Sequence, residues 1–117
     1  MSCTVEGNRI SLTRGDSTAL LVGIIYDDEQ YTPQPGDKVR FALKRAKMDA
    51  KKSRFIDPEP LVEKDIPIDT MILALEPKDT KHLLFGDYVY DVEITFSDGF
   101  VETFIADAPF ELTPEVH

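Results

Sequence analysis

The sequence predicts an all-β domain, an antiparallel sandwich or barrel of about seven to eight short strands with one short helical turn. Three observations predict this fold class. Apolar and polar residues alternate with a period of two, as in strands that have one face on a core. Runs rich in Gly, Asp, Ser and Pro separate the alternating segments, as turns do. The length of 117 residues fits a single domain, residues 1–117, with its own core.

The first expected strands are Asn8–Thr13 and Thr18–Tyr26. The second segment is apolar at both odd and even positions, which favours a central strand covered on both faces. Gly23 lies inside it and indicates a bulge or a close contact with another part of the chain.

The later strands follow the same period-two pattern. The clearest segment starts at Tyr88, and every second residue up to Phe96 is apolar. The expected later strands are Lys38–Lys44, Pro60–Ile66, Thr70–Glu76, Tyr88–Phe96, Phe100–Ile105 and Pro109–Thr113.

Turn chemistry separates these strands at Arg14–Ser17, Pro35–Asp37 and Ser97–Gly99. Ser97–Gly99 lies between two alternating runs and predicts a hairpin. The tripeptide Arg14-Gly15-Asp16 matches an integrin-binding motif, but three residues match easily by chance. A turn between two strands is the better interpretation of these residues.

Two segments have helical character. Pro77–Leu83 predicts one short helical turn, with Pro77 at its first position and Leu83 and Leu84 facing the core. A second helix is conceivable over Ala42–Ser53, although that segment is mostly charged and has no apolar stripe.

Tyr88 has a more specific role in the predicted fold. It opens an alternating strand shortly after a strand end and a short turn, within Leu73–Ile94. This order matches the E–F corner of immunoglobulin-like sandwiches, where a tyrosine hydroxyl bonds to upstream backbone. Filling the core is the alternative role for Tyr88. Either role favours a sandwich.

Charge is distributed unevenly along the chain. The net charge is −9, which does not favour duplex nucleic acid as a partner. Eight of the thirteen Lys and Arg residues nevertheless lie between Lys38 and Arg54. The basic segment from Lys44 to Arg54 is either a contact for phosphates or an acidic partner, or a solvated excursion between strands. We favour the excursion.

Residues for catalysis or metal binding are few. The single cysteine, Cys3, lies near a terminus that we expect to fray, and His82 and His117 have no partnered nucleophile. Asp27–Glu29 is typical of a hairpin tip and lacks the spacing of a calcium loop. We therefore expect no enzyme activity, no catalytic residue, no cofactor and no bound metal.

The chain resembles a group of small tailed-phage and prophage proteins from Gram-positive bacteria, over roughly Asn8 to Val116. The likeness is to the immunoglobulin-like N-terminal domain of the phage baseplate upper protein and its stand-alone relatives. It departs at Ala46–Arg54, which is longer than the expected loop. The segments that carry the likeness are, in order, LTRGDSTALLVGI, PGDKVRFALK, PLVEKDI, LALEPKDT, GDYVYDVEITFSDG and PFELTPEV.

The resemblance implies an immunoglobulin-like antiparallel β-sandwich and a non-enzymatic structural or interaction module, associated with the tail or baseplate of the virion. The implied partners are other phage structural proteins, and a homo-oligomer is left open. No signal peptide or membrane segment is visible, so we expect synthesis in the bacterial cytoplasm and then association with virions. The alternative is a sandwich that binds carbohydrate or the host surface, with Tyr26, Tyr31 and Phe100 as candidate stacking residues.

Overall fold

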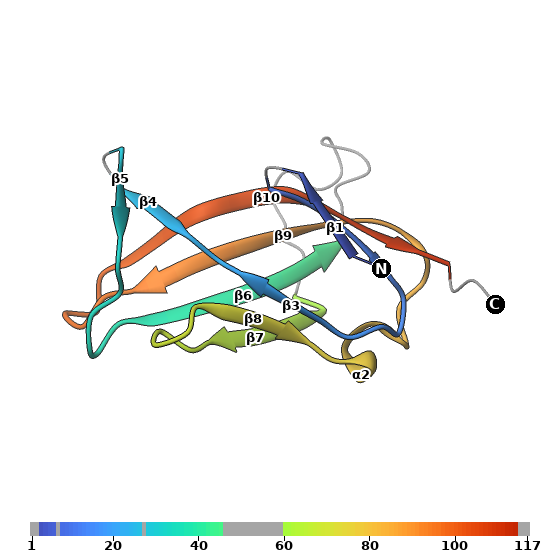
Figure 1. Ribbon diagram of the computed structural model, residues 1–117, viewed down its shortest axis with the longest axis horizontal. Coiled ribbons are helices and arrows are strands. Elements are labelled where there is room, and N and C mark those ends of the chain that lie inside the picture. Colours follow the sequence, from blue (N-terminus) through green and yellow to red (C-terminus); the bar gives the residue numbers. More distant parts are fainter. Residues whose placement is uncertain (1–2, 7, 27, 46–59, 115–117) are drawn as a thin grey trace.

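The computed structural model describes residues 3–6, 8–26, 28–45 and 60–114 (Figure 1). In this part of the chain it is mainly β with one short helical turn, which confirms the predicted class. The elements are β1 (Cys3–Glu6), β2 (Arg9–Thr13), β3 (Thr18–Leu21), β4 (Ile24–Tyr26), β5 (Glu29–Tyr31), β6 (Lys38–Arg45), β7 (Val62–Ile66), β8 (Ile72–Leu75), α2 (Pro77–Thr80), β9 (Gly86–Thr95) and β10 (Val101–Thr113).

The main sheet has six strands in the order β1-β2-β10-β9-β6-β7 and curls into a half-barrel (Figure 1). Its pairs are antiparallel except β2 with β10, where Ile10 to Thr13 run parallel to Phe110 to Thr113. The prediction of a wholly antiparallel sheet is wrong at this pair. Parallel strands need a long connection, and here nearly the whole chain lies between the two partners.

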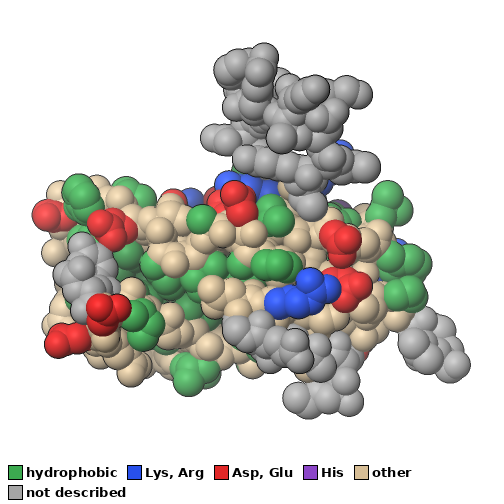
Figure 2. Space-filling model, turned by 90° about the horizontal axis from the view of Figure 1, so that it is seen from above, with side chains coloured by type: hydrophobic (Ala, Val, Ile, Leu, Met, Phe, Trp, Pro, Cys, Tyr) green, Lys and Arg blue, Asp and Glu red, His purple; other side chains and the backbone are tan. Residues whose placement is uncertain are grey.

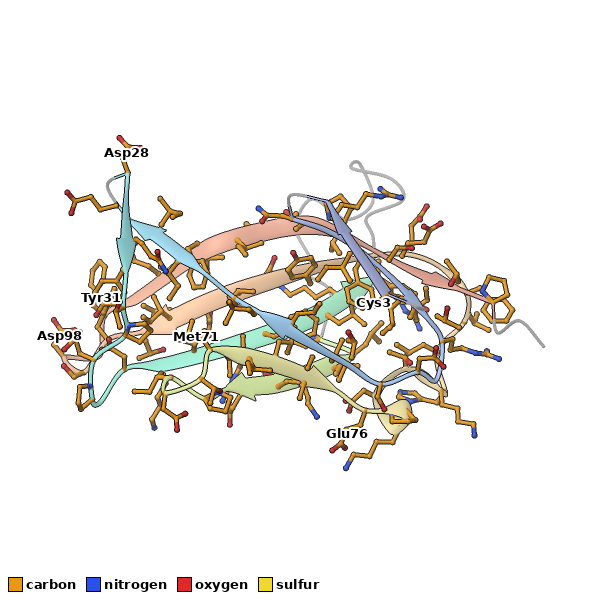
Figure 3. All side chains as sticks on the ribbon, viewed as in Figure 1. Cys3, Asp28, Tyr31, Met71, Glu76 and Asp98 are labelled. Atoms are coloured by element: carbon orange, nitrogen blue, oxygen red, sulfur yellow. The ribbon has the colours of Figure 1, made fainter. Side chains whose placement is uncertain are left out.

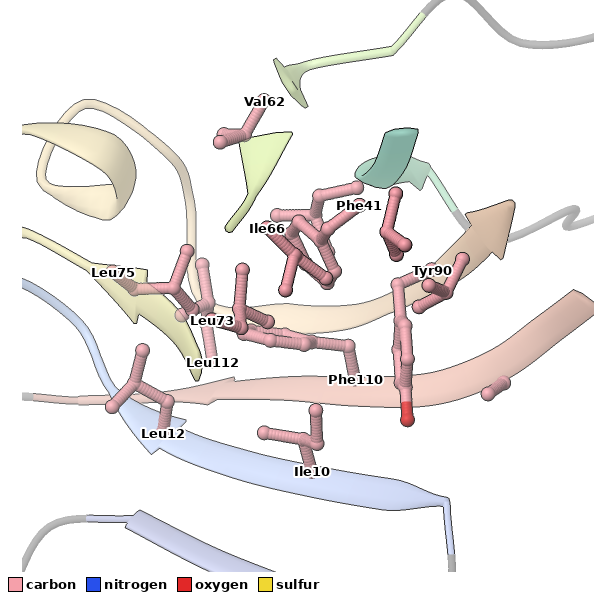
Figure 4. Close-up of a cluster of buried hydrophobic side chains, with 14 of the residues drawn as sticks. Ile10, Leu12, Phe41, Val62, Ile66, Leu73, Leu75, Tyr90, Phe110 and Leu112 are labelled. Carbon is pink, nitrogen blue, oxygen red and sulfur yellow. The ribbon is translucent and has the colours of Figure 1, made fainter. Parts of the chain in front are cut away.

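Two small sheets accompany the main sheet in the described part of the chain. β3 pairs with β8, and these strands lie across the open side of the half-barrel, while the β4–β5 hairpin stands at one end (Figure 1). The rings of Phe41, Tyr90 and Phe110 pack between the layers, with centroids 5.5 to 6.3 Å apart. Aliphatic side chains from both layers surround these rings (Figure 4).

The period-two pattern places the core correctly in the inner strands. In β6, Val39, Phe41 and Leu43 are buried, as predicted. In β9, Tyr90, Val92 and Ile94 are buried and the residues between them are less so. The mixed burial of these strands shows that one face of the sheet meets the core.

The predicted central strand Thr18–Tyr26 is wrong. The chain forms two short strands there, each in a separate two-stranded sheet, and the break falls at Val22 and Gly23. Leu21 is 80% exposed and Ile25 is 65% exposed, so the second face is not covered. Of the two alternatives for Gly23, a bulge or a close contact, the close contact is absent, because a Cβ on Gly23 would meet no atom within 4 Å.

The helical segments are partly as predicted. Pro77 is the first residue of α2 and Leu83 is buried, but Leu84 is exposed rather than facing the core. A helix starting at Ala42 is wrong for its described part, because Ala42 to Arg45 continue strand β6 and pair with β9. The rest of that segment lies outside the described residues.

The C-terminal strands differ from the prediction in continuity. Phe100–Ile105 and Pro109–Thr113 belong to one long strand, β10, rather than two. The register of β10 against β9 shifts between Thr103 and Ile105 and again before Ala108. Such bulges bend a strand, so β10 can curve around the core without ending.

The hydrogen bond predicted for Tyr88 is confirmed. Its hydroxyl donates to the carbonyl oxygen of Leu84 at 2.7 Å. The hairpin at Ser97–Gly99 is confirmed as well, since the Phe96 amide donates to the Phe100 carbonyl at 2.8 Å. Local turn chemistry in the sequence therefore fixes these two connections.

Candidate docking groove

An apolar cavity of about 300 Å³ lies between the β3–β4 segment and the inner face of the main sheet. Figure 2 looks onto the molecule from the β10 side and shows apolar side chains along the middle of this face. The lining residues are Asn8, Ile10, Leu20, Leu21, Val22, Gly23, Leu73, Tyr90, Val92 and Ile105. They come from five strands, the β3–β4 link and the turn before β2, so the fold as a whole builds this groove.

The backbone of β3 forms one wall of the groove. Its register pairs Leu20 with Leu73 and Leu21 with Ile72, and the Val22 amide donates to the Met71 carbonyl at 2.8 Å. In an antiparallel ladder, successive residues turn their amide and carbonyl groups to opposite sides. The amide of Val22 faces β8. The amide and carbonyl groups of Ala19 and Leu21 therefore face away from β8.

That outward edge of β3 has no strand partner in the part of the chain that the structure describes. Strand β10 forms a second such edge. β2 pairs only with Phe110 to Thr113, so residues 101–108 of β10 pair with β9 alone among the described strands. Ile105 from this stretch lines the same cavity as Leu20 and Leu21, so the two edges border one groove. Unpaired strand edges are templates for another strand.

Tyr90 forms part of the floor of the groove. It is 4% exposed, and its hydroxyl donates to the carbonyl oxygen of Asn8. Burial raises the pKa of this phenol, so the hydroxyl remains a donor. The bond ties β9 to the start of β2 and leaves the Tyr90 ring as an apolar surface beside Val92.

A buried carboxylate fixes the end of the molecule where the β4–β5 hairpin joins β6. Asp37 is 6% exposed and accepts hydrogen bonds from the Tyr31 hydroxyl at 2.6 Å and the Gln34 amide at 2.8 Å. It also accepts one from the Ser97 amide at 3.2 Å. The Tyr31 and Gln34 bonds hold the pKa of Asp37 below its usual value, and the same carboxylate raises the pKa of Tyr31. Sequence analysis identified these positions only as a turn and a possible stacking residue.

The Arg14-Gly15-Asp16 tripeptide forms the turn that was predicted. The Arg14 guanidinium donates to the Leu83 carbonyl at 3.2 Å and lies 4.3 Å from the centre of the Phe85 ring. Gly15 has a φ of +83°, and its amide donates to the Thr80 hydroxyl at 2.9 Å. These contacts attach the turn to α2 and the segment that follows it.

The remaining sequence candidates do not gather into one site. Cys3 is half-buried and paired in β1, so the prediction that it frays is wrong. His82 is exposed, as expected for a turn residue, and Asp28 lies at the tip of the β4–β5 hairpin (Figure 3). Among the described residues, no group of three or more His, Cys, Asp or Glu side chains is placed to hold a metal ion.

The basic segment is described only in part. Strand β6 is an inner strand, where the Lys44 ammonium pairs with the Asp91 carboxylate at 2.6 Å. Arg40 pairs with Glu63 at 3.3 Å. These side chains are therefore engaged within the domain. The positive residues from Lys47 to Arg54 lie outside the described residues.

Of the candidate stacking residues, Tyr31 is bonded to Asp37 and packs edge-on against Phe96, whereas Phe100 is exposed. The side chain of Tyr26 is outside the description. Tyr31 is thus engaged within the fold by Asp37 and Phe96, and carbohydrate binding stays a prediction.

Comparison with protein-family models, curated proteins and solved structures gives no match for this chain. No helix in the described residues is long and apolar enough to cross a membrane. The groove itself was missed in the sequence analysis. The sequence feature that could have indicated the groove is the apolar run around Leu21 and Ile25. We interpreted that run as a strand covered on both faces.

Proposed function

We propose that the chain is a non-enzymatic structural or interaction module of phage origin, associated with the tail or baseplate of the virion. The observation that carries the interaction role is the apolar groove bordered by two strand edges without partners in the described chain. Strand edges beside an apolar groove allow a partner to bind through both its backbone and its side chains. The phage origin is supported by the sequence resemblance.

We further propose that the architecture derives from an immunoglobulin-like sandwich. In this interpretation, β3 and β8 are the remnant of the second sheet, which packs on the main sheet through Leu73 and Leu75. The hydrogen bond from Tyr88 to Leu84 supports the assignment, because it is the contact of a tyrosine corner. The curl of the main sheet and the parallel β2–β10 pair are then departures from the parent fold.

The experiment is mass spectrometry of purified particles after induction of the prophage that encodes the chain. We expect its peptides to co-purify with the tail proteins in a constant ratio through a density gradient. A lysate from a strain without the major tail protein is the control, because association with tails should then disappear. Expression in the cell together with absence from intact particles would overturn the virion role.

A further inference from the structure

The groove presents an orderly set of unpaired backbone groups on one side. Ala19 and Leu21 direct their peptide groups away from β8, and no strand of the described chain meets them. A strand that pairs with this edge would make two or more ladder hydrogen bonds. Small molecules and sugars do not reproduce that spacing of donors and acceptors, whereas an extended peptide does.

Next to this edge, the cavity is apolar and has room for side chains. Its volume of about 300 Å³ corresponds to about ten water molecules. Tyr90, Val92 and Ile105 form its inner surface, and no charged residue is among its lining residues. In a strand paired with β3, every second side chain would point toward this surface. The groove therefore selects a peptide with apolar residues at alternate positions.

Charge around the groove selects the flanking residues of that peptide. The framing segments 18–26, 28–31 and 101–108 contain Asp28, Glu29, Glu102 and Asp107 but no Lys or Arg. Figure 2 shows acidic side chains at both ends of the apolar strip, with a basic side chain beside those at the right-hand end. Arg9 is already paired with Glu111 at 3.7 Å.

We propose that the groove binds an extended segment of a partner protein by strand addition to β3. The segment carries apolar side chains at alternate positions and lysine or arginine at its ends. This inference deepens the interaction role proposed above and rests on it. The bound strand would stand where the half-barrel lacks one, between the edges of β3 and β10.

The test uses three labelled synthetic nonapeptides and fluorescence anisotropy with the full chain. The first is Lys-Thr-Val-Thr-Val-Thr-Val-Thr-Lys, the second has Glu in place of both Lys residues, and the third has Pro in place of the central Val. We expect the first to bind, the second to bind on the order of tenfold more weakly at low salt, and the third not to bind. Amide shifts on titration should centre on Ala19 and Leu21.

Variants of the protein distinguish strand addition from nonspecific hydrophobic binding. Leu21→Pro removes an amide donor from the groove edge and should weaken binding of the first peptide at least about fivefold. Ile72→Pro is the matched control, because Ile72 pairs with Leu21 in register and its amide points to the opposite edge. It should leave the affinity unchanged. Circular dichroism melting confirms that each variant is folded.

Charge reversal gives a second readout that does not depend on proline. Glu29→Lys should weaken binding of the first peptide and strengthen binding of the Glu-ended one, whereas Glu63→Lys on β7 should change neither. Equal affinity of the parent protein for the Lys-ended and Glu-ended peptides would overturn the charge selection, and no binding at millimolar peptide would overturn strand addition.

Self-association is the other informative outcome. Sedimentation equilibrium showing a dimer that Leu21→Pro dissociates would make a second copy of this chain the occupant and overturn the partner-peptide proposal. The virion experiment reports separately on the proposed function. A chain that is present in particles but does not bind the peptides would retain the virion role and lose only this inference.

Discussion

Removal of the Tyr88 hydroxyl tests the connection between α2 and β9. In Tyr88→Phe the half-buried ring and its apolar contacts stay, and only the 2.7 Å hydrogen bond to the Leu84 carbonyl is lost. A hydrogen bond of this kind makes a net contribution of about 0.5–1.5 kcal/mol to the free energy of unfolding. Because Leu84 is exposed, water can solvate the freed carbonyl, so we expect the free energy of unfolding to fall by about 1 kcal/mol.

This loss converts into a measurable melting shift. A chain of 117 residues has an unfolding entropy near 0.25 kcal/mol/K, so the Tm should fall by about 4 °C. Calorimetry gives the Tm, and urea unfolding gives the free energy with an unchanged slope. Tyr88→Leu, which also removes the ring, should be less stable than Tyr88→Phe. A Tm of Tyr88→Phe equal to that of the parent would refute the structural role of the hydroxyl.

Three further changes probe other parts of the molecule. Phe110→Ala removes a ring that is 1% exposed, and urea unfolding should show a loss of about 3–5 kcal/mol; a loss below about 1 kcal/mol would contradict the packed core. The folded-state pKa of Asp37 is lowered, so its contribution to stability is present above pH 4 and is lost as the pH falls through that pKa. Urea midpoints between pH 2 and 6 should therefore fall less steeply on acidification in Asp37→Asn than in the parent, and parallel pH profiles would count against the role of this carboxylate. A double-mutant cycle with Lys44→Ala and Asp91→Ala should give a coupling of about 1 kcal/mol that decreases in 1 M salt, and zero coupling would show that the pair is not an interacting unit.

Sequence periodicity predicts the inner strands well for a physical reason. β6 and β9 have neighbours on both sides, so only their side-chain faces differ, and burial follows the period of two at Phe41 and Tyr90. The extent of β10 was harder to predict. Its bulges interrupt the period-two pattern, so the sequence indicated two strands where the structure has one. The parallel pairing of β2 could not be foreseen, since it depends on partners at opposite ends of the chain.

The candidate groove was not predicted because periodicity says nothing about the existence of a covering layer. Thr18–Tyr26 is apolar on both faces, which is also the pattern of a covered central strand, but Leu21 and Ile25 are exposed. Likewise, the Pro35–Asp37 turn was visible in the sequence, whereas the contact of Asp37 with Ser97 joins segments far apart. A contact between segments so far apart depends on the tertiary structure, which sequence periodicity does not report.

The pairing of β2 with β10 has a consequence for how the protein folds as it is made. Ser11 and Glu111 pair in register, although they are 100 positions apart in the sequence. During synthesis, β2 leaves the ribosome early but meets no partner of this ladder until the last strand has emerged. The sheet is therefore completed only after β10 has been synthesised, and contacts of such long sequence separation make this step slow. Until then β2 lacks the partner in β10 that pairs with Ile10 to Thr13, and unpaired strands with apolar residues are prone to aggregate.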